Sequence, residues 1–205
     1  MNPAPREAVA APPLSEEVLD QLFRQARSHS GWTDRPVADR QLRELYELMK
    51  WGPTAANCSP ARLVFVRSAA AKERLKPCLA PGNVDKAMAA PVVALVGMDM
   101  EFYEHLPRLF PQTDARSWFA GNPDAIRETA FRNSALQGAY LMLAARSLGL
   151  DCGPMSGFDA GTLETEFFPD GRVKANFICA LGYGDHDRLH GRHPRLDFDE
   201  ACRIL

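Results

Sequence analysis

The chain has 205 residues, with 24 Lys and Arg against 26 Asp and Glu, and 46% of its residues are hydrophobic. A formal charge of −2 without long runs of one sign gives no footprint for nucleic acid, whose phosphates need clustered cations. The apolar stretches at 92–98 and 139–145 are far shorter than the ~20 residues that cross a bilayer. We therefore expect a soluble α+β protein without nucleic-acid or membrane partners, with a flexible tail over residues 1–13 and a single domain over residues 14–205.

The five cysteines are odd in number, widely spaced and free of any C-x-x-C pair. This spacing disfavours both a disulfide framework and a zinc ribbon. The proline-rich start of the chain lacks the continuous apolar core of a secretory signal. Together these features predict a cytoplasmic protein.

The first third of the chain predicts two helices, a loop, a strand and a third helix. Ser15 is a suitable N-cap for a helix over residues 15–28, and apolar residues at helical spacing predict a second helix from Asp39 that ends before Pro53. The segment 53–60 is then a loop. Residues 62–67 have the β-branched and aromatic content of a strand, and residues 69–79 return to helix.

The rest of the chain predicts two further strands around one long helix. Residues 83–90 form a short helix, and the continuous apolar run 92–98 suits a strand that is buried on both faces. Residues 101–122 show no clean period and predict a lid or an irregular loop. Residues 123–148 are apolar on more than one helical face, which predicts a helix in a core or at a subunit interface. A loop over 152–158, a helix over 159–168 capped by Asp159 and a strand over 174–181 follow.

Neither standard phosphate-binding loop occurs in this sequence, since no G-x-G-x-x-G follows a predicted strand and no G-x-x-x-x-G-K-[ST] is present. Cys58 lies in a predicted loop, but nothing nearby specifies a base for a Cys–His nucleophile, so a small buried residue is the simpler interpretation. His186, His190 and His193 follow an H-x3-H-x2-H spacing, yet Gly191 and Pro194 oppose a helix there. Surface histidines are favoured, and no metal site is predicted.

Four separate segments carry a combination of residues that points to a cofactor. Residues 53–60 (PTAANCSP) resemble a P-S-x-x-N-x-Q-P loop, and residues 83–86 (NVDK) match N-x-x-K. Residues 154–158 (PMSGF) follow the long helix, and Gly182–Gly184 (GYG) precedes Arg195. In this order the segments resemble the flavin-contacting segments of the nitroreductase family. That resemblance implies a central mixed sheet flanked by helices and a homodimer that holds FMN at the subunit interface.

Five longer sequence motifs indicate which members of that family the chain resembles most. The motifs are GWxxxPV at 31–37, KWGPT at 50–54, EFYExLP at 101–107, DARSWF at 114–119 and GPMSGFD at 153–159. The chain resembles the malonic semialdehyde reductases of pyrimidine degradation, which implies ping-pong hydride transfer from NADH or NADPH through FMN to the aldehyde, giving 3-hydroxypropanoate. Other acceptors stay open (a nitroaromatic, quinone or enone), as do a flavin-binding protein without turnover and a structural domain without flavin.

The resemblance also implies the residues that contact FMN. They are Arg27, Ser28, His29, Pro53, Thr54, Ala55, Asn57, Asn83, Lys86, Asn133, Pro154, Ser156, Gly157 and Arg195. Arg27, Ser28 and Arg195 suit the phosphate. For the family's remaining arginines two interpretations stay open: His29 substitutes for one of them, or the segment is shifted by one residue. Ser59 stands where the family has Gln. Lys86 and Asn83 suit the pyrimidine edge of the flavin, where reduction places negative charge; the alternative for both is a solvated helix start.

A substrate that carries a carboxylate needs a cation near the flavin. Arg116, in the DARSWF stretch beside Trp118 and Phe119, is the candidate for this contact. A surface arginine in a loop is the alternative. No side chain stands out as a proton donor, so solvent is left in that role.

Overall fold

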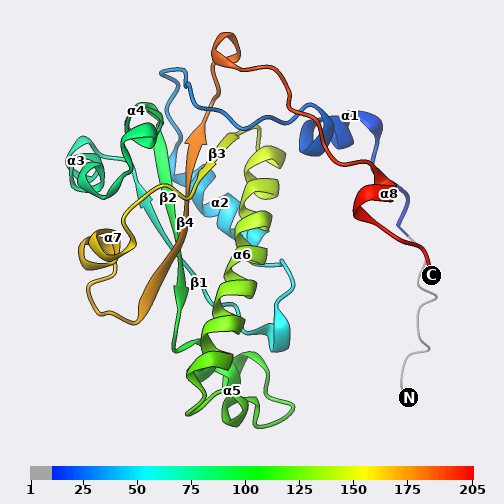
Figure 1. Ribbon diagram of the computed structural model, residues 1–205, viewed down its shortest axis with the longest axis vertical. Coiled ribbons are helices and arrows are strands. Elements are labelled where there is room, and N and C mark those ends of the chain that lie inside the picture. Colours follow the sequence, from blue (N-terminus) through cyan, green and yellow to red (C-terminus); the bar gives the residue numbers. More distant parts are fainter. Residues whose placement is uncertain (1–10) are drawn as a thin grey trace.

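A computed structural model describes residues 11–205. Most of the tail predicted for residues 1–13 therefore lies outside the described residues. The strands are β1 (Ala61–Val66), β2 (Val92–Asp99), β3 (Asp151–Met155) and β4 (Val173–Gly182), and they form one sheet in the order β1-β2-β4-β3 (Figure 1). None of the described helices has the combination of length and apolar character needed to cross a membrane.

All three strand pairings in this sheet are antiparallel, so the predicted mixed sheet is wrong for the four strands of one chain. For β1 and β2, the pairing of Val66 with Val93 shows that the helical connection between the strands leaves and re-enters the sheet at the same end. A single bridge between Ser28 and Cys152 is the parallel pairing that the described chain contains.

Helices cover both faces of the sheet (Figure 1). The longer ones are α2 (Asp39–Met49), α3 (Ala69–Leu75), α4 (Pro81–Ala89), α6 (Pro123–Ser147) and α7 (Ala160–Phe167). The short helical turns are α1 (Glu16–Leu19), η1 (Asp20–Arg24), η2 (Ala55–Asn57), η3 (Lys76–Cys78), η4 (Phe102–His105), α5 (Leu106–Leu109), η5 (Ala115–Trp118), η6 (His186–Arg188) and α8 (Phe198–Ala201). α2 and α6 pack on one face, and α3, α4 and α7 pack on the other.

The alternation of side chains along β2 explains why its sequence is apolar throughout. Val93 and Leu95 belong to the core that includes Leu163 of α7. Ala94 and Val96 belong to the opposite core, with Leu141 of α6. Both faces of the strand are therefore buried, which confirms the prediction for residues 92–98.

The long helix is also confirmed. It spans Pro123–Ser147, begins at Asn122, whose side chain accepts a hydrogen bond from the N–H of Ala125, and is followed by Gly149 at a φ of +72°. On either side of its buried stripe the helix leaves Phe131, Leu136 and Tyr140 exposed. The helix is thus buried along one side and apolar along part of the other.

Three predicted elements are wrong. Residues 152–158 were predicted as a loop, but β3 begins at Asp151; Pro154 is tolerated because β3 is an edge strand, where a missing N–H leaves no ladder partner unpaired. The first helix ends at Arg24 rather than at residue 28, because Ser28 is drawn into its bridge with Cys152. Residues 101–122 form short helical turns around a small core that contains Phe102 and Phe119, rather than an irregular loop.

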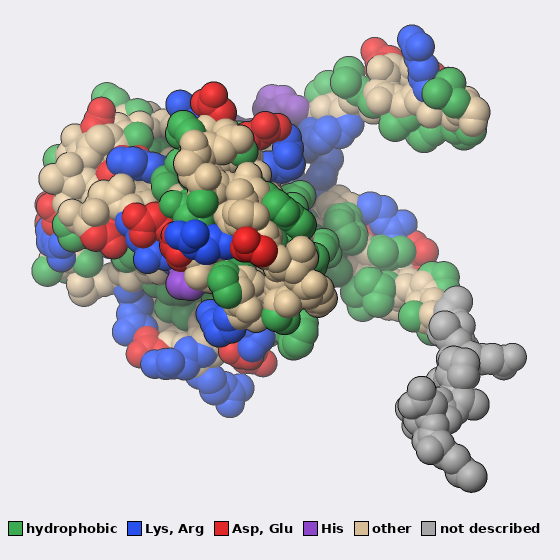
Figure 2. Space-filling model, turned by 90° about the horizontal axis from the view of Figure 1, so that it is seen from below, with side chains coloured by type: hydrophobic (Ala, Val, Ile, Leu, Met, Phe, Trp, Pro, Cys, Tyr) green, Lys and Arg blue, Asp and Glu red, His purple; other side chains and the backbone are tan. Residues whose placement is uncertain are grey.

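Two arms project from the body of the molecule, as Figure 2 shows. One carries α1, where Phe23 of the following turn is exposed, and the other is the tail that ends in α8, with Leu196 and Phe198 exposed. The site described next lies where the inner parts of these two arms meet the sheet.

Candidate functional site

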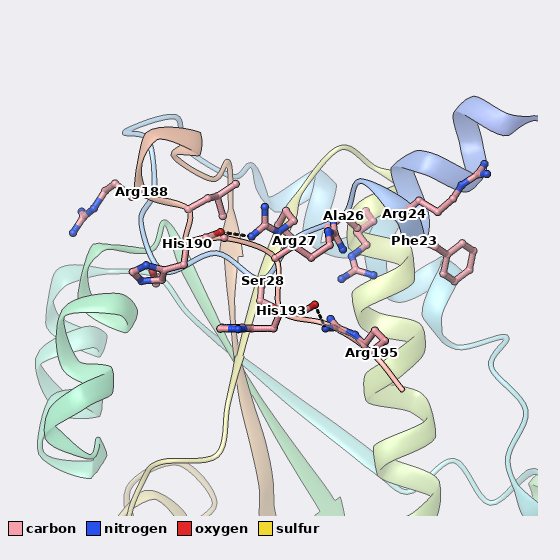
Figure 3. Close-up of a pocket in the computed structure, with 14 residues that line it drawn as sticks. Phe23, Arg24, Ala26, Arg27, Ser28, Arg188, His190, His193 and Arg195 are labelled. Carbon is pink, nitrogen blue, oxygen red and sulfur yellow. Dashed lines mark hydrogen bonds between the residues drawn. The ribbon is translucent and has the colours of Figure 1, made fainter. Parts of the chain in front are cut away.

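A pocket of about 560 Å³ lies between the segment that follows α1 and the C-terminal tail (Figure 3). Its charged and titratable lining residues are Arg24, Arg27, Arg146, Arg188, Arg192, Arg195, His190 and His193. Among the residues that the structure describes, no Asp or Glu lines this pocket. Arg24 pairs with Glu16 and Asp20 outside the lining, whereas the other arginines of the pocket have no carboxylate partner among the described residues. Such guanidinium groups favour an anion, and their fork geometry suits a phosphate.

Hydrogen bonds between the two segments hold this pocket together. Arg27 Nη2 donates to the carbonyl of His190 at 2.5 Å, and Arg192 Nη2 donates to the carbonyl of Ala26 at 3.1 Å. Arg146, which lines the pocket, donates from Nη1 to the carbonyl of Leu22 at 2.9 Å, while its buried Nε has no hydrogen-bond partner among the described residues. Because a buried donor without a partner is costly, this N–H is suited to an anionic ligand.

Three of the residues predicted for the phosphate therefore meet: Arg27, Ser28 and Arg195 all line the pocket. Sequence reasoning missed Arg146 and Arg188. The signal for Arg188 was the density of basic residues over 188–195, whereas Arg146 sits at the end of a long helix where a cation is ordinary. Only the tertiary structure brings Arg146 to this place.

His29 does not line the pocket, so its predicted role as a substitute for a phosphate arginine is not supported by its placement. Its side chain turns inward and lies against Gly184, and the residue as a whole is 4% exposed. The Ser28–Cys152 bridge fixes the backbone here, which directs alternate side chains to opposite sides.

The second and third predicted segments meet at the other end of β3. Asn83 Nδ2 donates to the carbonyl of Gly157 at 3.0 Å, and a Cβ on Gly157 would lie 2.6 Å from that nitrogen. A side chain at position 157 would therefore displace the Asn83 amide and break this hydrogen bond. Lys86 lies one helical turn further along α4 and is half-buried, and its carbonyl accepts a hydrogen bond from Trp32 Nε1 at 3.1 Å.

β3 connects these two places. Cys152 at its start is bridged to Ser28 of the arginine pocket, and Gly157 follows its end. Five residues of extended chain span roughly 16 Å. A molecule with a phosphate at one end and a flat ring at the other can thus lie along β3, with Pro154 and Ser156 exposed beside it.

The loop 53–60 is held in an unusual backbone conformation. Ala56, Asn57 and Ser59 have φ values of 48°, 50° and 40°, which non-glycine residues rarely adopt. Ser59 N–H donates to Thr54 Oγ1 at 3.1 Å, and Asn57 Nδ2 donates to the carbonyl of Leu109 at 2.9 Å. These bonds leave the tip of the loop exposed at Pro53 and Ala55.

Asn133 anchors this loop from α6. Its Oδ1 accepts from Ala55 N–H at 2.8 Å, and its Nδ2 donates to the carbonyl of Thr129 at 2.8 Å. Since both polar ends of this buried side chain are occupied, its placement indicates positioning of the loop rather than direct contact with a ligand.

The loop does not reach the arginine pocket within one chain. Asn133 holds the loop and Arg146 lines the pocket, and these two residues are separated by 13 positions of a straight helix, or roughly 20 Å. The four predicted segments therefore form two separate groups in a single chain.

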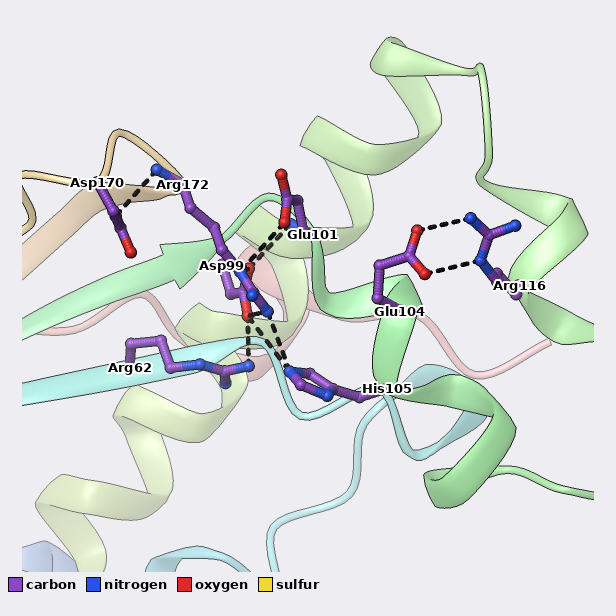
Figure 4. Close-up of polar contacts among 8 residues, drawn as sticks. All are labelled: Arg62, Asp99, Glu101, Glu104, His105, Arg116, Asp170 and Arg172. Carbon is purple, nitrogen blue, oxygen red and sulfur yellow. Dashed lines mark hydrogen bonds and ion pairs between the residues drawn. The ribbon is translucent and has the colours of Figure 1, made fainter.

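Arg116 is already paired. Its Nε and Nη2 donate to the two carboxylate oxygens of Glu104 at 2.8 and 2.7 Å (Figure 4), and its guanidinium lies 5.9 Å from the ring centre of Tyr103. The hydrogen bond from Arg116 lowers the pKa of Glu104. Both side chains are exposed, so the pair is accessible to a competing carboxylate.

Cys58 lacks the properties of a nucleophile. Burial raises the pKa of its thiol to about 11, although a hydrogen bond with Thr54 acts in the opposite direction. At neutral pH the residue is a protonated thiol within the small core around Phe102, in agreement with the simpler interpretation of the sequence.

Comparison with known proteins identifies the family. The model of the nitroreductase family matches residues 9–183, and the chain belongs to this family. It is 62% identical over 192 residues to a protein of Polynucleobacter asymbioticus, covering 94% of this chain and 98% of that one, and 61% identical over 192 residues to a protein of Rhodopseudomonas palustris, with the same coverage. Both relatives are named, provisionally, NADH dehydrogenase/NAD(P)H nitroreductase.

Solved structures share the fold. A provisionally named nitroreductase from Exiguobacterium sibiricum, in complex with FMN, superposes with a TM-score of 0.83 at 19% identity, covering 94% of this chain and 99% of that chain. An enone reductase of a gut-bacterial fatty acid saturation metabolism superposes with a TM-score of 0.81 at 18% identity, covering 94% and 100%. These likenesses confirm the nitroreductase-like α+β fold.

Proposed function

We propose that this protein is an FMN-dependent NAD(P)H oxidoreductase that reduces malonic semialdehyde to 3-hydroxypropanoate. The observation that carries the flavin part is the arginine pocket, which is joined through β3 to the Asn83–Gly157 contact. The names of the relatives and the FMN complex of the structural neighbour support the same class. The aldehyde part rests on the sequence resemblance described above.

The residues present fit FMN. Arg27, Arg195 and the unpartnered Nε of Arg146 would hold the phosphate, and the backbone of 154–157 would lie along the ring. Bound FMN supplies the route by which a hydride passes from NADH or NADPH to the carbonyl carbon. Lys86 has no ion-pair partner within residues 11–205, so its charge is available to stabilise negative charge at the pyrimidine edge.

A second copy of the chain completes the site in this proposal. The loop 53–60 lies roughly 20 Å from the arginine pocket of its own chain. Exposed aromatic residues lie near the loop and along α6: Trp51, which is 79% exposed, precedes the loop, Tyr140 lies against Gly52, and Phe131 is exposed elsewhere on α6. Apolar area of this kind favours association, so the loop of one protomer would meet the flavin of its partner.

Size-exclusion chromatography with multi-angle light scattering tests this assembly. We expect a molar mass in solution that is twice that of the 22.7 kDa chain. A monodisperse monomer that still binds FMN would contradict the shared site.

A cytoplasmic location belongs to the same proposal. All five cysteines are free thiols, and four of them are buried without a disulfide. This state fits a reducing compartment, where NADH and NADPH are also available.

The visible spectrum of the purified protein tests the function. We expect a yellow protein that is bleached by anaerobic NADH or NADPH and regains its colour when malonic semialdehyde is added. Recovery only with a quinone, a nitroaromatic compound or an enone would retain the oxidoreductase and reject the aldehyde. Bound FMN that neither nicotinamide bleaches would indicate a flavin-binding protein without turnover, and a colourless protein that binds no FMN would reject the proposal.

A further inference from the structure

His29, Asp151 and His186 come together beside the arginine pocket, although they lie far apart in the sequence. One possible ligand atom from each residue lies within 4.8 Å of the others. His29 follows the first arm, Asp151 begins β3, and His186 opens the helical turn η6 that leads into the tail. The cluster therefore joins three segments that are otherwise linked by isolated β-bridges and single hydrogen bonds.

The distance between His29 and Asp151 is long for a hydrogen bond. His29 Nε2 lies 3.4 Å from Asp151 Oδ1, beyond the usual range of about 2.7–3.2 Å. Two ligands that each lie about 2.1 Å from a tetrahedral metal ion are separated by roughly 3.4 Å. The observed separation thus matches two vertices of a coordination tetrahedron better than it matches a hydrogen bond.

The buried imidazole of His29 presents its Nε2 to Asp151, and the side chain is only 1% exposed. Its Nδ1, which has no hydrogen-bond partner among the described residues, lies against Gly184. Imidazole binds metal ions in its neutral form, which burial favours.

The other two residues are placed to complete such a site. The Asp151 carboxylate is fixed by the N–H of Gly184, which donates to Oδ2 at 2.8 Å and leaves Oδ1 free. The ring of His186 stands edge-on to that of His29, with 5.3 Å between the centroids. His186 is exposed, so a rotamer change can close the remaining distance. Asp185 adds negative charge, whereas Arg27 opposes a cation.

We propose that His29, Asp151 and His186 bind a divalent transition-metal ion such as Zn²⁺, with water in the fourth position. Two imidazoles and one carboxylate are a ligand set that suits Zn²⁺ and its neighbours and does not suit Mg²⁺. Such an ion would fix the first arm, β3 and the start of the tail, which carry Arg27 and Arg188 of the pocket. The site is structural and lies outside the proposed reaction.

Isothermal titration calorimetry tests this proposal. The sample is the tag-free, FMN-loaded protein, which is first treated with EDTA and then freed of the chelator. We expect one Zn²⁺ per chain and no saturable binding of Mg²⁺. Loss of an outer-shell partner costs a metal site about 10- to 100-fold in affinity, so loss of a direct ligand in His186→Ala or Asp151→Asn should weaken Zn²⁺ binding by at least about tenfold. His193→Ala removes an exposed histidine of the same tail and should leave the Zn²⁺ affinity unchanged.

Thermal unfolding gives an independent readout. Saturating Zn²⁺ should raise the Tm of the wild-type protein and of His193→Ala, but not that of His186→Ala, because only a bound ligand stabilises the native state. His186 is exposed and its replacement should not impair folding, which the flavin absorbance of the variant verifies. Equal Zn²⁺ affinity in the wild-type protein, His186→Ala and Asp151→Asn, or no saturable binding in the wild-type protein, would overturn the proposal.

Discussion

Asn133 and Ala55 are joined by a hydrogen bond of 2.8 Å between a buried side chain of α6 and the backbone of an exposed loop. Because this loop also contains three non-glycine residues at positive φ, its shape depends on such external support. The bond thus connects the longest helix of the fold to the segment that the proposed dimer presents to FMN.

Replacing Asn133 with Ala should therefore affect FMN binding more than folding. Ala55 is an exposed residue and its N–H can bond to water instead, so the free energy of unfolding should fall by only about 1 kcal/mol. Once freed, the loop should lose its fixed shape, and the dissociation constant for FMN should rise. Fluorescence titration of the apoprotein with FMN measures this change. Ser147→Ala, which removes another side-chain bond on α6 far from the loop, is the matched control; equal FMN affinity in the two variants would refute the positioning role.

The arginine pocket predicts that its side chains contribute to binding of the FMN phosphate and not to binding of the flavin ring. Hydrogen bonds to charged groups contribute about 1.5–3 kcal/mol, so Arg27→Ala and Arg195→Ala should each weaken FMN binding by roughly 10- to 150-fold. Riboflavin lacks the phosphate, and its affinity should be the same for the wild-type protein and both variants. Arg132→Ala removes an exposed arginine that pairs with Glu128 and should change neither titration. If riboflavin binding weakened as much as FMN binding, the phosphate assignment would fail.

The sequence predicted those elements whose pattern lies within one continuous segment, and it missed those that depend on distant residues. The helix 39–49 and the buried strand at 92–98 were predicted because their patterns are regular over a whole element. β3 was missed because Gly153 and Pro154 read as loop residues, and only an edge position with a close neighbour makes them suitable for a strand.

The site shows the same division. Motif resemblance located the segments that contain Arg27 and Asn83, since each motif is contiguous in the chain. It could not locate Arg146, whose contribution depends on where a helix ends relative to two distant segments. Nor could it show that His29 faces away from the pocket, because the direction of a side chain is set by the bridge that its neighbour Ser28 makes.

The Arg116–Glu104 pair predicts how a carboxylate substrate would be recognised. In the proposed reaction, the carboxylate of malonic semialdehyde competes with Glu104 for the guanidinium fork. Arg116→Ala should raise the KM for malonic semialdehyde by about tenfold, as expected for one lost charged hydrogen bond, while the KM for a quinone stays the same. Glu104→Gln weakens the competitor and should lower the KM for the aldehyde. Steady-state kinetics with both acceptors measure the difference, and an unchanged aldehyde KM in Arg116→Ala would remove this residue from the site.

Asp99 predicts the behaviour of the protein in acid. Its buried carboxylate accepts hydrogen bonds from Arg172 Nε and Nη2, both at 2.7 Å, and pairs with Arg62 near His105 (Figure 4). Burial alone would raise the pKa of Asp99, but the hydrogen bonds from Arg172 and from the N–H of Glu101, with the charge of Arg62, outweigh it and lower the pKa. The native state therefore binds a proton less readily than the unfolded chain does.

The lowered pKa of Asp99 determines how the free energy of unfolding changes with pH. Since the folded pKa is below the unfolded value, the stabilisation by Asp99 is complete above the unfolded pKa and is lost as the pH falls through the folded pKa. Asp99→Asn should lower the free energy of unfolding at pH 7 by about 3 kcal/mol, near the low end for breaking a buried ion pair because both guanidinium groups are partly exposed. Urea unfolding between pH 7 and pH 3 should show a smaller acid-induced loss in the variant than in the wild-type protein. Parallel stability profiles for the two proteins over this range would show that Asp99 does not contribute to acid sensitivity.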